Sequence, residues 1–271
     1  MKYITLQNGR ELPMVGFGTY RIGDNNEVSE VIKDAYEAGY RLFDSASYYK
    51  NEAALQEAFL SLGIREEVML TSKVWNDKES YDAVTVSFAE SEAALGDIDI
   101  YMLHWPAREF VSRWKALEDL YESGRVKAIG VSNFKKHHLE TLLENARIKP
   151  MINQIEAHVY FMDWDTINFC KDENIAVQAW RPLMRTGNML SDTRIAQMAA
   201  RYEKSVAQIC LKFLLQSGIA IIPKSVNPLR MQENIDLFDF TLTEEDMAFL
   251  YDLNAGLRTS DDPDTFFLPQ A

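Results

Sequence analysis

Short apolar runs rich in β-branched residues alternate along the chain with longer amphipathic stretches, at a period of roughly 30 residues. The apolar runs predict eight strands, at residues 14–19, 41–44, 68–74, 98–104, 127–132, 151–156, 176–180 and 219–223. No linker rich in Pro, Gly or Ser interrupts the alternation. The pattern therefore predicts one continuous domain over residues 1–271.

The amphipathic stretches predict helices at residues 26–39, 52–63, 80–96, 110–124, 135–146, 164–174 and 206–218. In the first of them, helical spacing places five side chains on one face: Val28, Val31, Ile32, Ala35 and Tyr36. This stretch and several others end at a glycine such as Gly39, which is typical of a left-handed residue at a helix C-terminus.

Eight parallel strands, each followed by a helix, close most simply into a (β/α)₈ TIM barrel, because open doubly wound sheets usually have fewer strands. Residues 1–13 alternate like two strands around Asn8 and Gly9, which predicts an N-terminal β-hairpin before the barrel.

Composition narrows the classes of partner. The net charge of −13 and the pI near 4.8 disfavour nucleic acid and anionic lipid, while leaving room for a local basic pocket. No apolar run approaches the roughly 20 residues that span a bilayer, and the first residues do not resemble a signal peptide. Cys170 and Cys210 have no metal-ligand spacing, which favours reduced thiols and a cytoplasmic location.

Three consecutive predicted strands end on unlike ionisable residues: Asp44, Lys73 and His104. Barrel enzymes carry their catalytic residues at this end of the strands. Singly, each residue also has a structural interpretation, as a turn cap, a snorkelling lysine or a satisfied histidine beside Trp105. Together they favour a site in which Lys73 pairs with Asp44.

Tyr49 follows Asp44 by five residues, close enough for a loop to bring its hydroxyl to the same place. An ammonium group and an imidazole nearby are expected to lower the tyrosine pKa from about 10, which makes a usable general acid. Aromatic rings at Tyr20, Tyr48, Trp75 and Trp105 are candidates for the substrate pocket, although each is also typical of a core residue.

Six stretches of the sequence resemble signatures of the aldo-keto reductase family: "GYRLFDSASYYKNE", "TSKVWN", "DIYMLHWP", "GRVKAIGVSNF", "NQIEAH" and "IPKSVNPLRMQEN". They run in order through nearly the whole chain and look like a prokaryotic-type member with short loops. The resemblance implies a monomeric barrel that reduces aldehydes or ketones with NADPH. Such a hydride transfer requires no metal. The resemblance also implies that the catalytic residues are Asp44, Tyr49, Lys73 and His104.

The same resemblance implies a coenzyme site without a GxGxxG motif, because "GFGTYR" lacks the third glycine. Ser132, Asn133 and Gln154 would bind the nicotinamide carboxamide, and Trp180 would stack on the ring. The 2′-phosphate would lie on Lys224, Ser225 and Arg230, which favours NADPH over NADH. The other implied coenzyme contacts are Thr19, Arg181, Leu183, Glu233 and Asn234.

Two residues depart from the family pattern. Lys50 stands where a glycine is common, and Arg181 stands where a serine is common. We hypothesise that Arg181, with Arg185, binds coenzyme phosphate or attracts acidic substrates. The segment after "HWP" and the tail of residues 257–271 look short for the family, which predicts an open pocket and a wide range of small carbonyl substrates.

Two other functions stay open on the sequence. In one, Lys73 forms a Schiff base with a carbonyl substrate, as in barrel lyases. In the other, the chain is a noncatalytic NADPH-binding regulatory module. The basic spot around Arg230 also has an ordinary interpretation as the charged face of a surface helix.

Overall fold

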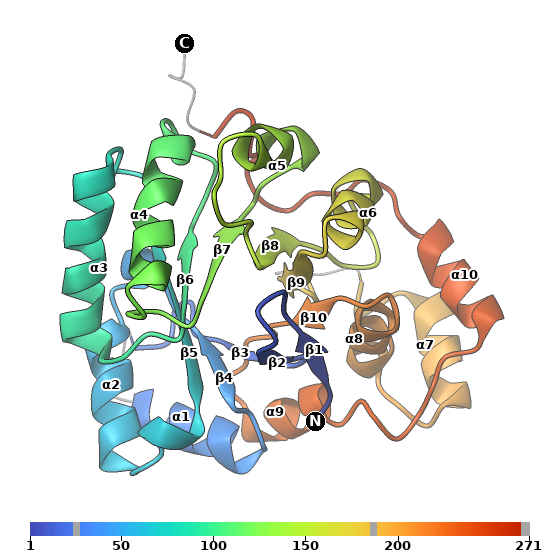
Figure 1. Cartoon of the computed structure of the whole chain (residues 1–271). Helices are drawn as coiled ribbons and strands as arrows, with labels where there is room; N and C mark the ends of the chain where they lie inside the picture. Colours follow the sequence, from blue (N-terminus) through green and yellow to red (C-terminus); the bar gives the residue numbers. More distant parts are fainter. Residues whose placement is uncertain (24–27, 185–188, 267–271) are drawn as a thin grey trace.

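Eight parallel strands form the centre of the molecule, as the apolar runs predict (Figure 1). A computed structural model describes residues 1–23, 28–184 and 189–266. The strands are β3 (Phe17–Gly18), β4 (Leu42–Asp44), β5 (Met69–Val74), β6 (Ile100–Leu103), β7 (Ala128–Ser132), β8 (Ile152–Glu156), β9 (Ala176–Trp180) and β10 (Ala220–Ile221). Each pairs in parallel with the next along the chain.

The first and last strands meet and close the barrel. Val15 forms a parallel bridge with Ile221, and the backbone N–H of Gly16 donates to the Ile221 carbonyl at 2.8 Å. Gly18 continues the seam by donating to the Pro223 carbonyl at 3.1 Å. A Cβ at Gly18 would lie 3.0 Å from the Ile222 carbonyl oxygen, so glycine permits this close approach. The predicted barrel is confirmed, with its seam strands shorter than the apolar runs.

The predicted N-terminal hairpin is also present. Strands β1 (Tyr3–Thr5) and β2 (Glu11–Pro13) pair in antiparallel fashion. Between them, the Gln7 side chain donates to the carbonyls of Pro150 and Asn174, and Asn8 donates to the Lys127 carbonyl. These carbonyls belong to loops that enter β7, β8 and β9, so the hairpin covers the N-terminal end of the barrel. The opposite end, where the strands finish, stays open for a site.

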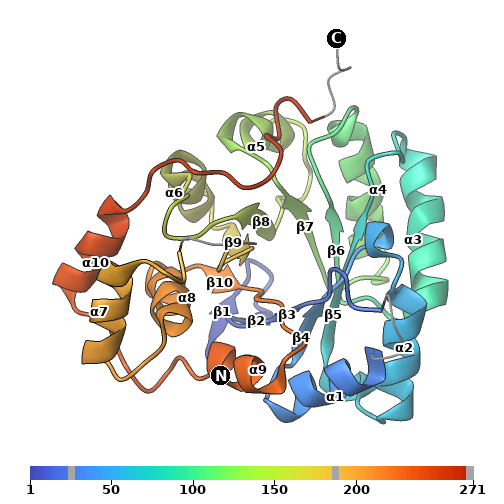
Figure 2. The same ribbon diagram turned by 180° about the vertical axis from the view of Figure 1, so that it is seen from behind.

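Helices form a ring outside the strands (Figures 1 and 2). Those that match the predicted ranges are α1 (Val28–Glu37), α2 (Glu52–Ser61), α3 (Tyr81–Leu95), α4 (Phe110–Glu122), α5 (Lys136–Leu143), α6 (Trp164–Asp172) and α8 (Val206–Gln216). Helix α9 (Pro228–Ile235) carries Arg230 and its basic surroundings. The sequence reasoning missed α7 (Thr193–Arg201) and α10 (Glu244–Asp252). Each begins after a capping side chain, Asp192 and Thr243, and these caps were the available signal. Short 3₁₀ helices occur at η1 (Ser47–Tyr49) and η2 (Arg65–Glu67).

Helix α1 shows how far the apolar pattern reaches. Four of its five predicted positions are buried, and Gly39 follows the helix with a φ of +107°. The fifth, Tyr36, is only partly buried, because its hydroxyl extends to Glu67 and donates to the carboxylate at 2.5 Å.

Both cysteines are free and buried. Burial raises the pKa of the Cys170 thiol to about 12, so it stays protonated. In the part of the chain that the structure describes, no helix is long and apolar enough to cross a membrane.

Candidate active site

A buried ion pair lies at the C-terminal end of the barrel. Strands β4 and β5 run side by side with Asp44 opposite Thr71, so Asp44 and Lys73 lie on neighbouring strands near the same end of the barrel. The Lys73 Nζ donates to Asp44 Oδ2 at 2.6 Å and to the Ser45 carbonyl at 2.8 Å. Lys73 is fully buried, and the other oxygen of Asp44 accepts from Gln154 Nε2 at 2.7 Å. The predicted pairing is present and is fixed on both sides.

Tyr49 turns back over this pair at the end of η1. Its ring centroid lies 5.3 Å from Lys73 Nζ, 5.7 Å from the His104 ring and 4.9 Å from the Tyr20 ring. Lys50 ends η1 in the left-handed region, with a φ of 54° and its N–H on the Ser47 carbonyl. Such a conformation costs roughly 1–2 kcal/mol for a residue with a Cβ, which explains why a glycine suits the position.

The expected lowering of the Tyr49 pKa is wrong for this structure. Burial, and next the negative charge of Asp44, raise the pKa of Tyr49 well above its usual value. The Lys73 charge does not compensate, because its ammonium is already paired with Asp44. Without a ligand, Tyr49 therefore stays protonated at neutral pH.

His104 follows β6 and carries no charge. Burial lowers its pKa well below the usual value, and the cations of Lys73 and Arg113 lower it further. Its backbone carbonyl accepts from Asn133 Nδ2 at 2.9 Å, and its Nδ1 has no protein partner within the described residues. A neutral imidazole in this place can donate one N–H to a carbonyl oxygen.

An open cleft of about 940 Å³ lies above these groups, and all four predicted pocket aromatics line it. Tyr48 stacks on Trp75 with ring centroids 3.9 Å apart and an interplanar angle of 20°. The Trp75 ring also meets His104 edge-on, at 5.0 Å and 85°. Tyr20 and Trp105 complete the aromatic wall, so the cleft suits an apolar or mixed substrate.

The residues predicted to bind nicotinamide lie along the same cleft and form hydrogen bonds with one another. Ser132 Oγ donates to the Gln154 carbonyl at 2.9 Å, and Trp180 Nε1 donates to Asn133 Oδ1 at 3.0 Å. Gln154 uses its amide N–H groups on Asp44 and Gln178. Its Oε1 is therefore the atom left to accept from a carboxamide NH₂. Thr19, Arg181 and Leu183 also line the cleft.

The residues predicted to hold the adenosine part are not all in the cleft. Lys224 lines it, whereas Ser225, Arg230, Glu233 and Asn234 lie beyond it at or on α9. Asn227 caps this helix by accepting from the Arg230 N–H at 3.1 Å, and Pro228 occupies its first turn. The helix thus presents its N-terminus beside the exposed Arg230 side chain, whereas Asn234 is buried.

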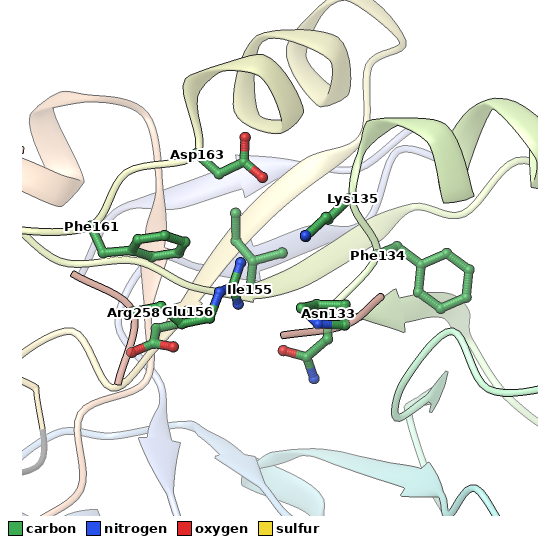
Figure 3. Close-up of a pocket in the computed structure, with 9 residues that line it drawn as sticks. Asn133, Phe134, Lys135, Ile155, Glu156, Phe161, Asp163 and Arg258 are labelled. Carbon is green, nitrogen blue, oxygen red and sulfur yellow. The ribbon is translucent and has the colours of Figure 1, made fainter. Parts of the chain in front are cut away.

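The sequence reasoning missed the C-terminal segment, residues 256–266, which crosses the cleft. Glu156 at the end of β8 anchors it by accepting from the Thr259 N–H at 2.8 Å and from Ser260 Oγ at 2.5 Å. Glu156 and Arg258 both line a small cavity of about 10 Å³, and Figure 3 shows these two residues next to each other. Phe266 packs on Trp105 with centroids 4.7 Å apart, so the segment supplies part of the pocket wall despite its short length.

Arg181 contacts this segment. Its Nη1 donates to the Thr259 carbonyl at 2.8 Å, and its guanidinium lies 5.0 Å from the Trp180 ring centroid. Arg181 has a φ of 50°, which places its backbone in the left-handed region. Arg185, predicted to act with it, lies outside the described residues.

One group of side chains has the donor types of a metal site. The Nε2 atoms of His137 and His138 lie 3.1 and 3.4 Å from Asp264 Oδ1. However, Lys135 Nζ already neutralises Asp264 at 2.7 Å, and the Lys135 N–H donates to His138 Nδ1. The neutral His138 ring then carries its proton on Nε2, which opposes metal binding there. We assign no metal to this group.

A closed barrel with an ion pair, a tyrosine and a neutral histidine at the ends of adjacent strands defines a (β/α)₈-barrel enzyme. A sequence profile described as "Aldo/keto reductase family" matches residues 14–255. The chain therefore belongs to the aldo/keto reductase family, as the six quoted stretches indicate.

Known relatives match over nearly their full length. The chain is 42% identical over 265 residues to a glyoxal reductase of Bacillus subtilis (strain 168), with 96% of each chain covered. It is 36% identical to the methylglyoxal reductase DkgA of Escherichia coli O157:H7, with 97% of each covered. Among solved structures, a mutant of Gox0644 in complex with NADPH has a TM-score of 0.92 and 38% identity, covering 97% of this chain and 98% of that one.

Proposed function

We propose that this protein reduces the carbonyl group of small aldehydes and ketones with NADPH, with Tyr49 as the proton donor. The observation that carries the proposal is that Tyr49, His104 and Asp44 line the aromatic cleft, and that the buried Lys73 is paired with Asp44 behind it. The residues suited to a nicotinamide line the same cleft. The NADPH complex of a relative with the same fold supports the choice of coenzyme.

The coenzyme fits the donors present. Trp180 offers an aromatic face in the cleft, Gln154 keeps one acceptor atom for the carboxamide, and Ser132 and Asn133 offer polar atoms beside it. NADPH supplies the hydride when bound, and the chain's part is to hold the reacting atoms close together.

Proton transfer then falls to Tyr49. Its raised pKa keeps the hydroxyl protonated, as a general acid must be before it reacts. When the proton leaves, Tyr49 becomes a phenolate. The Lys73 cation, whose Nζ lies 5.3 Å from the centroid of the Tyr49 ring, stabilises this negative charge. The neutral His104 donates an N–H to the carbonyl oxygen and so orients it, while Asp44 keeps Lys73 in place.

The geometry speaks against a Schiff-base lyase. Lys73 is fully buried, lies outside the set of residues that line the cleft, and donates to both Asp44 and Ser45. A substrate carbonyl would have to displace both contacts before it reached the amine.

Lys224, Ser225 and Arg230 give the preference for NADPH over NADH in this proposal. A guanidinium and a helix N-terminus bind a 2′-phosphate far better than a 2′-hydroxyl. Glu233 and Asn234 then lie on the adenine side. We further infer a single domain over residues 1–271 that works as a monomer. Its free, buried thiols fit a reducing compartment such as the cytoplasm.

The names of the relatives point to α-dicarbonyls as test substrates. We expect the purified protein to oxidise NADPH in the presence of glyoxal, methylglyoxal or simple aldehydes, and to do so much faster than it oxidises NADH. The loss of NADPH absorbance measures both rates. Tight NADPH binding without turnover over the whole panel would instead identify a regulatory module.

Replacing Arg181 with Ser tests the coenzyme role of this unusual arginine. We expect the Kd for NADPH to rise about tenfold, which corresponds to about 1.4 kcal/mol, because the substitution removes a cation from the cleft and its tie to Thr259. Titration of the coenzyme by protein fluorescence measures this. Arg10→Ser, an exposed site on the opposite hairpin, is the matched control. An unchanged Kd in Arg181→Ser would remove the arginine from the coenzyme site.

A further inference from the structure

Arg113, on α4, is a buried cation to which the proposed reaction gives no direct role. Its side chain is fully buried, yet it makes one hydrogen bond, from Nη2 to the Trp75 carbonyl at 3.1 Å. Its Nε and Nη1 have no protein partner among the described residues. Removing a guanidinium from water costs several kcal/mol. If Arg113 only filled space in the core, an apolar side chain of similar volume would make the fold more stable.

The residue that Arg113 holds lies at the centre of the aromatic wall. Trp75 directly follows β5, and its ring contacts Tyr48 face to face, His104 edge-on and Phe266 at 6.4 Å. Backbone after a strand end is free of the sheet ladder and needs another partner to fix it. For the Trp75 carbonyl the side-chain partner is Arg113, at 3.1 Å, and the backbone N–H of Lys78 adds a longer contact at 3.4 Å.

We propose that Arg113 is a positioning residue of the reductase site, whose buried guanidinium fixes the Trp75 backbone and, through it, the aromatic wall against which the substrate packs. The expected effect on kinetics rests on the proposed function. The expected effect of Arg113 on the position of Trp75 does not depend on turnover.

The charge of Arg113 also acts on His104, by favouring the neutral form of its imidazole. Around His104 lie the cations of Lys73 and Arg113 and the hydroxylated rings of Tyr48 and Tyr49. Both cations favour the neutral imidazole, although burial is the larger cause of its lowered pKa. Arg113 therefore also helps to keep His104 in the form that donates a single N–H to the carbonyl oxygen.

A direct test follows the Trp75 ring by fluorine NMR in protein labelled with 5-fluorotryptophan. The Trp75 signal is assigned by its loss in Trp75→Phe. We expect Arg113→Met, which keeps the length but removes the donors and the charge, to shift or broaden this signal, and the signal of the distant Trp164 to stay unchanged. Arg113→Lys, which retains a cationic donor, should restore the native position. A native Trp75 signal in Arg113→Met would overturn the proposal.

Kinetics supplies the second readout. With benzaldehyde, which needs the aromatic wall, we expect KM to rise about tenfold in Arg113→Met with a smaller change in kcat. With propanal KM should change less than twofold, and the Kd for NADPH should be native. A uniform loss with both aldehydes in folded protein would indicate general destabilisation and overturn the positioning role. If the native protein reduces neither aldehyde, the proposed function fails, and the NMR comparison still decides the role of Arg113.

Discussion

We expect turnover to fall by about 10²- to 10⁴-fold when Tyr49 is replaced by Phe, which is the range for loss of a general acid. The substitution removes a single oxygen and keeps the ring contacts to Tyr20 and His104. The alkoxide that forms on hydride transfer then has no side chain from which to take a proton. Lys73 is buried in its ion pair with Asp44, and His104 is neutral. Steady-state kcat with a saturating aldehyde measures the loss.

Tyr48→Phe is the matched control for this result. Tyr48 is the neighbouring residue and lines the same cleft, but it stacks on Trp75 and is half exposed. We expect its hydroxyl to be dispensable, with kcat within about threefold of native. NADPH should bind equally well to both variants, because the phenol is not among the proposed coenzyme contacts. Equal kcat in the native protein and Tyr49→Phe would assign the proton to another donor.

The sequence predicts the part of the site that strands build. Asp44, Lys73 and His104 stand at fixed places in the strand pattern, and the barrel rule places such positions at one end. Their convergence follows from the topology alone. The N-terminal hairpin was equally predictable, because Asn8 and Gly9 specify its turn without help from the rest of the chain.

The parts that the sequence does not predict depend on contacts between distant segments. The C-terminal segment crosses the cleft because Glu156 holds Thr259 and Ser260, more than 100 residues further along. Arg113 is only a polar position on a helix until the fold shows it fully buried under Trp75. Neither pairing leaves a local sequence signal.

The pKa of Tyr49 is another property that the sequence does not predict, because it depends on contacts in the folded structure. The sequence places a lysine near the tyrosine, and from that alone a lowered pKa follows. The structure shows that burial acts in the opposite direction, that the negative charge of Asp44 adds to it, and that the lysine is paired with Asp44. The direction of a pKa shift depends on how deeply the group is buried and on which charged groups are paired with one another. The spacing of residues along the sequence does not give either.

Replacing Lys73 with Met should lower the free energy of unfolding by about 3–5 kcal/mol and also reduce turnover severely. The methionine fills a similar volume but leaves the Asp44 carboxylate buried with Gln154 as a partner and no cation. The same change removes the charge that we propose stabilises a Tyr49 phenolate. Urea denaturation measures the stability, and kcat at saturating substrate measures the second effect.

The double variant Asp44→Asn with Lys73→Met separates these two consequences. Because it removes both charges, no ion stays buried without its partner, and most of the lost stability should return. Activity should not return, since the phenolate still lacks a cation nearby. If the double variant is no more stable than Lys73→Met, an unpaired Asp44 is not the cause of the instability. If it regains activity, the Lys73 cation is not what stabilises the charge on Tyr49, and the ion pair only orients the site.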